Sequence, residues 1–344
     1  MTVLVTGAAG FIGGHLVEGL VTKGYKVRCL VKPSSDTRLL QRYGVEIVNG
    51  DVREPASLRT AMVGVEKVYH LAALARLYAG LKLEDYMAVN AAGTRNMLEA
   101  SRLAGVRKFV HVSTFDAVGP SRDGQPVTEE TLCQPVNDYG RSKLAAELVV
   151  KEYMAKGLPV TIVRPPAVYG PRSTLHLSRL FKPVSKGWYP LFGDGSTLME
   201  FNYVSNQVEG IMLAGEKDRA VGNTYFISDE RSYHINEVLQ AVAKAVGRED
   251  LRIVRIPAVA GLIIGAAVEA VGKVVPIWPF RVPETGRPAF SRNTVRWTTS
   301  SIWFCSCEKA KRELGYRPPY TLEEGTRLTA EWFREKGCLA VPGV

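Results

Sequence analysis

Thr6-Gly7-Ala8-Ala9-Gly10-Phe11-Ile12-Gly13 follows the apolar run Val3-Leu4-Val5, and this stretch decides the fold. A short, β-branched apolar run is typical of a buried parallel strand. Beyond the glycines, apolar residues recur at helical spacing as far as Val21, and Gly24 ends that pattern as a C-cap glycine does. The stretch therefore predicts a strand, a tight turn and a helix.

Three glycines in such a turn suit a phosphate. The backbone can turn sharply there and approach a ligand closely, and the helix N-terminus offers N–H groups and a partial positive charge. The spacing is Gly-x-x-Gly-x-x-Gly rather than the commoner Gly-x-Gly-x-x-Gly, so the prediction depends on its place after the first strand. We expect a dinucleotide pyrophosphate at Gly7, Gly10, Phe11, Ile12 and Gly13. The alternative is a turn that only packs a helix against a sheet.

The end of the second expected strand bears on the choice of cofactor. NAD sites usually place Asp or Glu about 20 residues after the glycines, where it bonds the ribose 2′-hydroxyl. Here the strand at 26–31 ends in Lys32, and Arg38 is close by. A cation suits a 2′-phosphate, so Lys32 favours NADP, with NAD as the alternative. Lys32 could equally be a solvated strand end.

Strand-like and helix-like segments alternate through the first 165 residues. Apolar runs recur at 45–48, 68–72, 109–112 and 160–163, with helical stretches at 84–104 and 138–155. Such alternation predicts an α/β fold with a doubly wound parallel sheet of the Rossmann type. Loops rich in proline and glycine and short helices follow. We therefore expect a cofactor-binding domain at 1–165 and a smaller C-terminal substrate-binding region at 166–344, partly interleaved with the sheet.

Tyr139 and Lys143 stand four residues apart and therefore share one face of a helix. A free phenol has a pKa near 10, and we expect the ammonium group of Lys143 to lower the pKa of Tyr139. Tyr139 could then exchange a proton with a carbinol or carbonyl while hydride passes to or from a nicotinamide. The hydroxyls of Ser113 and Thr114 follow the strand at 109–112, and one of them could polarise the substrate oxygen. The alternatives are an exposed turn without a role and hydroxyls that only satisfy the backbone.

In this order, the strand, the glycine turn, the hydroxyl pair and Tyr-x-x-x-Lys resemble the extended short-chain dehydrogenase/reductase family, with its NAD-dependent epimerase/dehydratase type of fold. Other segments extend the resemblance over essentially the whole chain: Gly50–Val52, His70–Ala73, Val89–Thr94, Val163–Pro165 and Arg312–Pro318. In character the chain is most similar to 3β-hydroxysteroid dehydrogenase-like and dihydroflavonol reductase-like members.

The resemblance implies roles for particular residues. The cofactor residues that it implies are Asp51 and Val52 near the adenine, Ala72 and Ala73 along the cofactor, Pro166, and both Tyr139 and Lys143. It implies Tyr139 as the acid/base and Lys143 as its partner. Thr114 rather than Ser113 is the implied donor to the substrate oxygen, because it stands five residues before Gly119 as the family's catalytic hydroxyl does.

Two positions separate the chain from the nucleotide-sugar branch of this family. That branch usually has Asn where Ala167 stands and Arg where Met199 stands. A methionine cannot pair with a diphosphate and suits an apolar ligand. Apolar and aromatic residues are also expected to roof the site, namely Trp188, Tyr189, Leu191, Phe192 and Leu198, and the segment with Trp278 and Phe280 is similar to the carboxyl region of the steroid dehydrogenase-like members.

We therefore expect an NADP-preferring enzyme, an oxidoreductase that interconverts a secondary alcohol and a ketone. Its substrate would be small and hydrophobic: steroid-like, terpenoid or a long-chain β-keto compound. A nucleotide-sugar epimerase or dehydratase is the first alternative, because fold alone does not establish chemistry. A non-catalytic, cofactor-binding regulatory protein is the second.

Charge and composition limit the partners. The net charge is +10, but acidic residues are interspersed and no nucleic-acid-binding motif is present, so we expect no nucleic-acid partner. The uncharged run at 256–268 is too short to span a bilayer. It predicts either a buried helix or a helix that docks on a membrane surface, with peripheral contact through 256–280 helped by the basic flank.

The remaining expectations concern location and assembly. The five cysteines are scattered and lack a histidine partner, which predicts free thiols in a reducing compartment and no metal site. The first expected strand begins at about residue 2, so we expect no signal peptide and a cytoplasmic protein, membrane-associated if the run at 256–268 docks. The resemblance implies a homodimer formed through the helices near 84–104 and 138–157.

Overall fold

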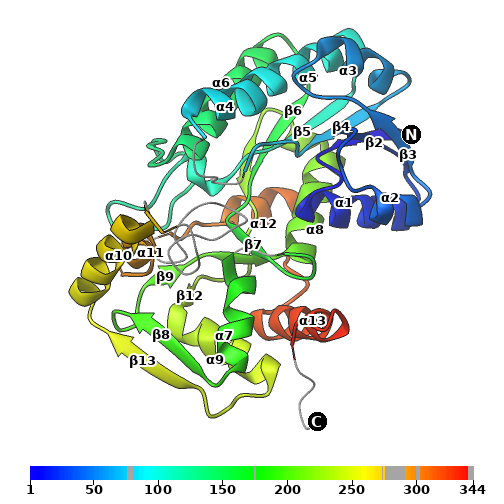
Figure 1. Ribbon diagram of the computed structural model, residues 1–344. Coiled ribbons are helices and arrows are strands. Elements are labelled where there is room, and N and C mark those ends of the chain that lie inside the picture. The colour runs from blue at the N-terminus through cyan, green and yellow to red at the C-terminus, as the bar shows by residue number, and fades with distance from the viewer. Residues whose placement is uncertain (76–80, 174–175, 273, 276–290, 300–302, 340–344) are drawn as a thin grey trace.

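A computed structural model describes residues 1–75, 81–173, 176–272, 274–275, 291–299 and 303–339 (Figure 1). Within these residues the largest sheet has seven strands in the order β11-β6-β5-β4-β1-β2-β3, and all its pairings are parallel. The strands are β1 (Thr2–Thr6), β2 (Lys26–Val31), β3 (Glu46–Asn49), β4 (Lys67–His70), β5 (Lys108–Val112), β6 (Val160–Arg164) and β11 (Thr224–Phe226). The prediction of a doubly wound parallel sheet is confirmed.

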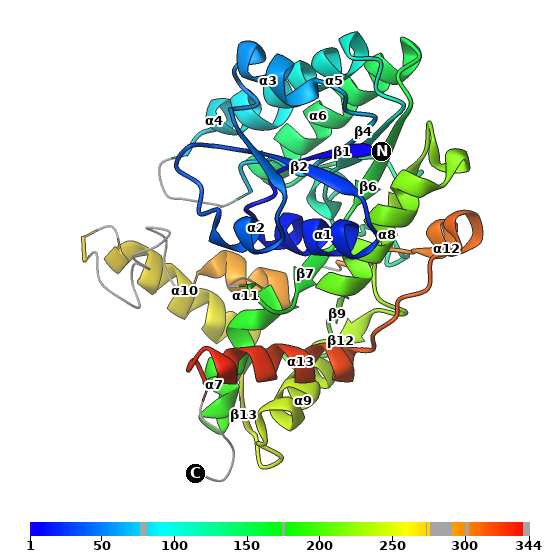
Figure 2. The same cartoon turned by 90° about the vertical axis from the view of Figure 1, so that its right-hand side faces the viewer.

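Helices cover both faces of this sheet (Figures 1 and 2). One face packs against α3 (Pro55–Met62), α5 (Gly93–Leu103) and α6 (Asp138–Ala155). The other face packs against α1 (Phe11–Thr22), α2 (Arg38–Arg42), α8 (Val204–Glu216) and α12 (Glu308–Leu314). Every residue of β4 and β5 is therefore buried, including His70 and His111.

The strand order reverses between β1 and β4. Chain order runs outward from β1 through β2 to β3 on one side, and from β4 through β5 to β6 on the other. Ligands of such sheets bind in the crevice at the carboxyl ends of the strands where the order reverses. The glycine turn follows β1, Ala72 and Ala73 follow β4, and Thr114 follows β5, so these residues come together at that edge.

The region after residue 165 contributes to two cores. Although it comes late in the chain, β11 pairs with β6 and extends the main sheet. A second core lies below, among two-stranded sheets and helices. These elements are β7 (Ala167–Tyr169) with β10 (Phe201–Tyr203), β9 (Leu198–Met199) with β12 (Tyr233–His234), β8 (Trp188–Phe192) with β13 (Arg252–Ile256), α7 (Phe181–Ser185), α9 (Ile235–Val246) and α13 (Leu322–Glu335). The boundary between 1–165 and 166–344 stays a prediction.

The helix expected at 84–104 is divided in the structure. It consists of α4 (Leu83–Met87), a π-helical turn η1 (Ala88–Ala92) and α5. Single π-turns within α-helices are frequent at functional sites. The turn contains Asn90, whose buried side chain donates to Ser142 Oγ on α6 and accepts from the backbone N–H of Leu74 after β4. Asn90 therefore joins helix α6 to the edge of the sheet.

Candidate active site

The turn between β1 and α1 forms a cradle that only glycine permits. Gly7 has φ +70°, and a Cβ there would lie 2.7 Å from the carbonyl carbon of Leu71. A Cβ on Gly13 would collide with the carbonyl oxygen of Gly7. Gly10 caps α1 without a side-chain hydrogen bond, so no side chain competes for the N–H groups of the first helical turn. The cradle therefore fits a pyrophosphate, as predicted from these glycines.

Phe11 and Ile12 begin α1 and are partly buried. Both side chains pack against the second core, and Ile12 also packs against the core beneath the sheet. Since their side chains are engaged in packing, the contribution we predict from them to a cofactor is their backbone N–H groups.

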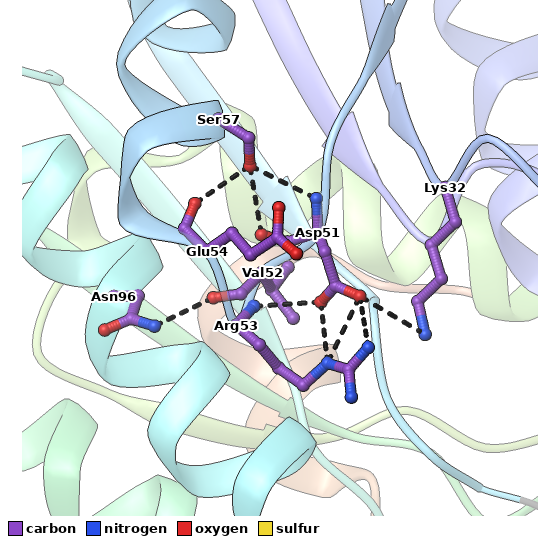
Figure 3. Close-up of polar contacts among 7 residues, drawn as sticks. All are labelled: Lys32, Asp51, Val52, Arg53, Glu54, Ser57 and Asn96. Carbon is purple, nitrogen blue, oxygen red and sulfur yellow. Dashed lines mark hydrogen bonds and ion pairs between the residues drawn. The ribbon is translucent and has the colours of Figure 1, made fainter.

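Lys32, Asp51 and Arg53 meet beside the ends of β2 and β3 (Figure 3). Arg53 Nη2 lies 2.7 Å from Asp51 Oδ2, and Lys32 Nζ lies 3.7 Å from the same oxygen. Hydrogen bonds from the Arg53 side chain lower the pKa of Asp51 to about 2. Two half-exposed cations thus share the carboxylate of Asp51, and the carboxylate of Glu54 also acts on Arg53. Lys32 was predicted from the sequence, whereas Arg53 was not.

The other predicted cofactor residues lie along the same edge. Val52 is buried, and its carbonyl accepts a hydrogen bond of 3.0 Å from Asn96 Nδ2 on α5. The N–H of Ala72 donates to Thr6 Oγ1 at 3.1 Å, and Ala73 is partly exposed beside it. Pro166 is buried just beyond β6. These positions follow the carboxyl ends of β3, β4 and β6 and carry no charge of their own.

Tyr139 and Thr114 are brought together at the crevice. Helix α6 begins at the cap Asn137, whose Oδ1 accepts from Gly140 N at 2.7 Å, and this cap sets the position of Tyr139 in the first turn. Thr114 caps the short helix η2 (Phe115–Ala117) beyond β5. The Thr114 side chain lies close enough to Tyr139 to lower the pKa of its hydroxyl. A proton donor and a second hydroxyl therefore lie near each other, as acid catalysis on a carbonyl oxygen requires.

The charges around Tyr139 differ from our expectation. Burial raises the pKa of Tyr139, the carboxylate of Asp116 raises it further, and the hydrogen bond with Thr114 opposes both effects. Lys143 Nζ instead donates to the Val112 carbonyl at 2.8 Å, and burial lowers the pKa of Lys143 to about 8. The predicted lowering of the Tyr139 pKa by Lys143 is thus wrong for this arrangement, because the ammonium group is directed at a backbone carbonyl. The assignment of Tyr139 and Lys143 as a catalytic pair stays a prediction.

Ser113 has a partner that Thr114 lacks. Ser113 Oγ donates to Glu147 Oε1 at 2.5 Å, and Glu147 forms a buried ion pair with Arg164 at 2.7 Å. The Ser113 hydroxyl is therefore committed to this buried cluster. Thr114 Oγ1 instead accepts from Asp116 N at 3.2 Å and donates to Asp116 Oδ2 at 3.3 Å, beside Tyr139. The choice of Thr114 as the donor to the substrate oxygen stays a prediction.

Asp116 is a site residue that the sequence analysis missed. Its Oδ1 accepts from Asn137 Nδ2 at 2.8 Å, and its Oδ2 lies 3.3 Å from Thr114 Oγ1. It thereby connects the cap of α6 to the Thr114 hydroxyl. The signal in the sequence that could have identified Asp116 is its place two residues after Thr114. Its role was not predictable from that place, because it is the turn of η2 that directs the carboxylate back towards Tyr139.

We expect Asp116→Asn to move the pH profile of alcohol oxidation to lower pH. A carboxylate disfavours a nearby phenolate, so its removal lowers the pKa of Tyr139, and the basic form appears at lower pH. The measurement is the pH dependence of kcat for alcohol oxidation. Asp138→Asn is the matched control, because Asp138 adjoins Tyr139 in sequence but pairs with Arg141. An unchanged profile, or a shift to higher pH, would show that Asp116 does not act on Tyr139.

Several residues expected to contact a substrate lie elsewhere. Met199 and Leu191 are buried in the second core, so they pack rather than line a site. Trp188 is half-exposed on β8, opposite Arg252 of β13. The predicted roof is therefore wrong for Leu191 and Trp188, because strand pairing turns one into the core and the other outward. Met199, which was expected to suit an apolar ligand, packs in the same core as Leu191. Ala167 is partly exposed at the start of β7, and Trp278 and Phe280 lie outside the described residues.

The chain belongs to the NAD dependent epimerase/dehydratase family, whose model matches residues 3–228. It is 33% identical to sterol demethylase protein B of Methylococcus capsulatus, over 98% of this chain and 100% of that protein. It is 31% identical to the 3 beta-hydroxysteroid dehydrogenase/Delta 5-->4-isomerase of Mycobacterium tuberculosis, over 94% of this chain and 87% of that one. Among solved structures it resembles the UDP-glucose 4-epimerase of Thermus thermophilus in complex with NAD, with TM-score 0.73 and 28% identity over 97% and 99% of the two chains.

These findings confirm the predicted family and place the chain among oxidoreductases that use a nicotinamide cofactor. No group of histidine, cysteine, aspartate and glutamate side chains in the described part of the chain could hold a metal ion. No helix there combines the length and the apolar character needed to cross a membrane. The homodimer and the cytoplasmic location stay predictions.

Proposed function

We propose that this protein is an NADP-preferring oxidoreductase that interconverts a secondary alcohol and a ketone on a hydrophobic substrate. The observation that carries the proposal is the proximity of Tyr139 and Thr114 at the strand ends, on the same edge of the sheet as the glycine cradle. A nicotinamide bound there supplies or accepts a hydride. In ketone reduction, Tyr139 would donate its proton to the carbonyl oxygen while Thr114 holds that oxygen by a hydrogen bond.

The preference for an apolar substrate has two supports. Position 199 is a buried methionine rather than an arginine, so it offers no charge to a nucleotide diphosphate. The relatives cited above are named for a sterol demethylase and a steroid dehydrogenase. A steroid-like, terpenoid or long-chain β-keto substrate fits both. Nucleotide-sugar epimerisation is the alternative, favoured by the likeness to a UDP-glucose 4-epimerase.

A cofactor-turnover experiment separates the two proposals. Native mass spectrometry of the purified protein reports any retained cofactor, and NADPH oxidation is then followed with a panel of steroid ketones, long-chain β-keto compounds and nucleotide sugars. Turnover with apolar ketones alone supports the reductase. Stoichiometric retained cofactor that no ketone oxidises, together with conversion of a nucleotide sugar, would establish the epimerase instead.

We expect Lys32→Asp to weaken NADP binding about tenfold to a hundredfold, as the loss of a charge-assisted contact does, and to affect NAD far less. Lys32 and Arg53 surround Asp51 at the corner where a 2′-phosphate would lie. The measurement is the Kd of each cofactor by fluorescence titration. Lys26→Asp, at the opposite end of β2, is the matched control. Equal losses for the two cofactors would show that Lys32 does not bind the 2′-phosphate.

A further inference from the structure

Helix α10 (Ala258–Gly272) turns its smallest residues, two glycines, towards the rest of the protein. Its buried residues are Gly261 and Gly265. A Cβ on Gly261 would lie 2.5 Å from Phe192 Cδ1, and one on Gly265 would lie 2.6 Å from the backbone nitrogen of Arg292, at the start of α11 (Arg292–Thr299). The helix therefore packs closely against β8 and α11 through glycine, and its larger apolar side chains contribute little to the core.

The outward face of this helix is apolar. Its large residues are Val259, Ile263, Ile264 and Val271, which are 69%, 66%, 45% and 38% exposed, and Val274 follows at 82%. Ala267 and Ala270 are exposed between them. These positions recur at helical spacing and form one stripe without a charged residue, which we call the α10 stripe. Figures 1 and 2 both show α10 at the outer margin of the molecule.

Such an arrangement reverses the usual one. A helix on a water-exposed surface normally turns its large apolar residues to the core and its polar residues outward. Helices that face lipid instead pack closely against their neighbours through glycine and turn their large apolar residues outward. A contiguous apolar stripe of this kind marks an interaction surface.

The surrounding charge favours a lipid surface as the occupant. The described residues between 251 and 299 contain four arginines against one glutamate. Arg252 and Arg255 are exposed on β13, directly before α10, and the described glutamate of α10, Glu269, is neutralised by Arg292 at 2.8 Å. Basic residues beside an apolar helix face complement anionic headgroups. Trp188, opposite Arg252 on β8, is an aromatic residue of the kind enriched at membrane interfaces.

We propose that the α10 stripe docks the protein on an anionic membrane surface, with α10 parallel to the bilayer plane and its apolar residues among the acyl chains. The helix has 15 residues and lies on the surface rather than crossing. This inference is independent of the proposed function, because it concerns a surface formed by α10 and β13 and not the crevice at the strand ends.

The test is sedimentation with vesicles of phosphatidylcholine containing 30% phosphatidylserine, compared with vesicles of pure phosphatidylcholine. The variants are Ile263→Glu/Val271→Glu on the stripe, and Val63→Glu, whose valine is 68% exposed far from α10, as the matched control. We expect the wild type and Val63→Glu to bind the anionic vesicles alike, and the stripe variant to bind at least tenfold less. Binding of the wild type should weaken as NaCl rises from 0.1 to 0.5 M.

Circular dichroism and thermal unfolding establish that each variant is folded. We expect the variants to fold because the substituted residues are exposed. A wild type that binds neither type of vesicle overturns the proposal. The proposal is also overturned if the wild type forms a dimer and binds no vesicles, while the stripe variant is a monomer. The stripe would then be an interface between two copies of the chain. Equal loss of vesicle binding in Val63→Glu would also overturn it, since the effect would not be specific to α10.

Discussion

Tyr139→Phe is expected to lower turnover at least about a hundredfold and to leave cofactor affinity nearly unchanged, because general acid–base catalysis typically contributes 10²–10⁴ in rate. Burial and Asp116 raise the pKa of Tyr139, so the phenol carries its proton at neutral pH. It is therefore ready to donate to a carbonyl oxygen. Phenylalanine keeps the ring and removes only the hydroxyl.

The measurement is kcat for ketone reduction, together with the Kd of the cofactor. Tyr153→Phe is the matched control on the same helix, because Tyr153 lies fourteen residues after Tyr139 and its hydroxyl donates to Glu99 of α5 at 3.1 Å. Retention of most activity in Tyr139→Phe would exclude Tyr139 as the acid. Loss of activity in both variants would indicate damage to α6 rather than lost chemistry.

Glu147→Gln is expected to destabilise the fold by about 3–5 kcal/mol, the usual cost of breaking a buried ion pair. Both partners are almost fully buried, and Arg164 Nε and Nη2 bond the two oxygens of Glu147 at 3.0 and 2.7 Å. Removal of the carboxylate leaves the guanidinium charge without compensation. It also weakens the acceptor of the Ser113 hydroxyl.

Urea unfolding measures this effect as a change in the free energy of unfolding. Glu152→Gln is the matched control, because it lies five residues further along α6 and pairs with Arg95 at the surface, with both side chains about half exposed. Such exposed pairs contribute about 0–1 kcal/mol. Similar losses for the two variants would show that the Glu147–Arg164 pair does not hold β6 to α6.

Local pattern was enough for much of the fold. The apolar runs and glycines around Gly7 and Gly13 specify a strand, a turn and a helix among neighbours in sequence, and α6 has the bounds expected for it. The same holds for Tyr139 and Lys143, since a spacing of four on a helix requires only helical geometry. What spacing could not predict is where each polar group finds its partner.

Arg53 and Asp116 show why the site was incomplete. Each lies two residues from a predicted position, yet its role depends on a turn that directs its side chain back to the site. The error about Met199 has the same origin: apolar character predicts burial, but not whether the side chain faces a core or a ligand.

The sequence by itself determined the doubly wound sheet, the glycine cradle and the order of the catalytic motifs, because each follows from the spacing of residues close together in the chain. Only the tertiary structure decided which hydroxyl remains beside Tyr139, where the Lys143 amine is directed and which side of α10 faces outward. These outcomes depend on contacts between distant segments: Ser113 with Glu147, Lys143 with Val112, and Gly265 with Arg292. The spacing of residues within one segment does not specify such contacts.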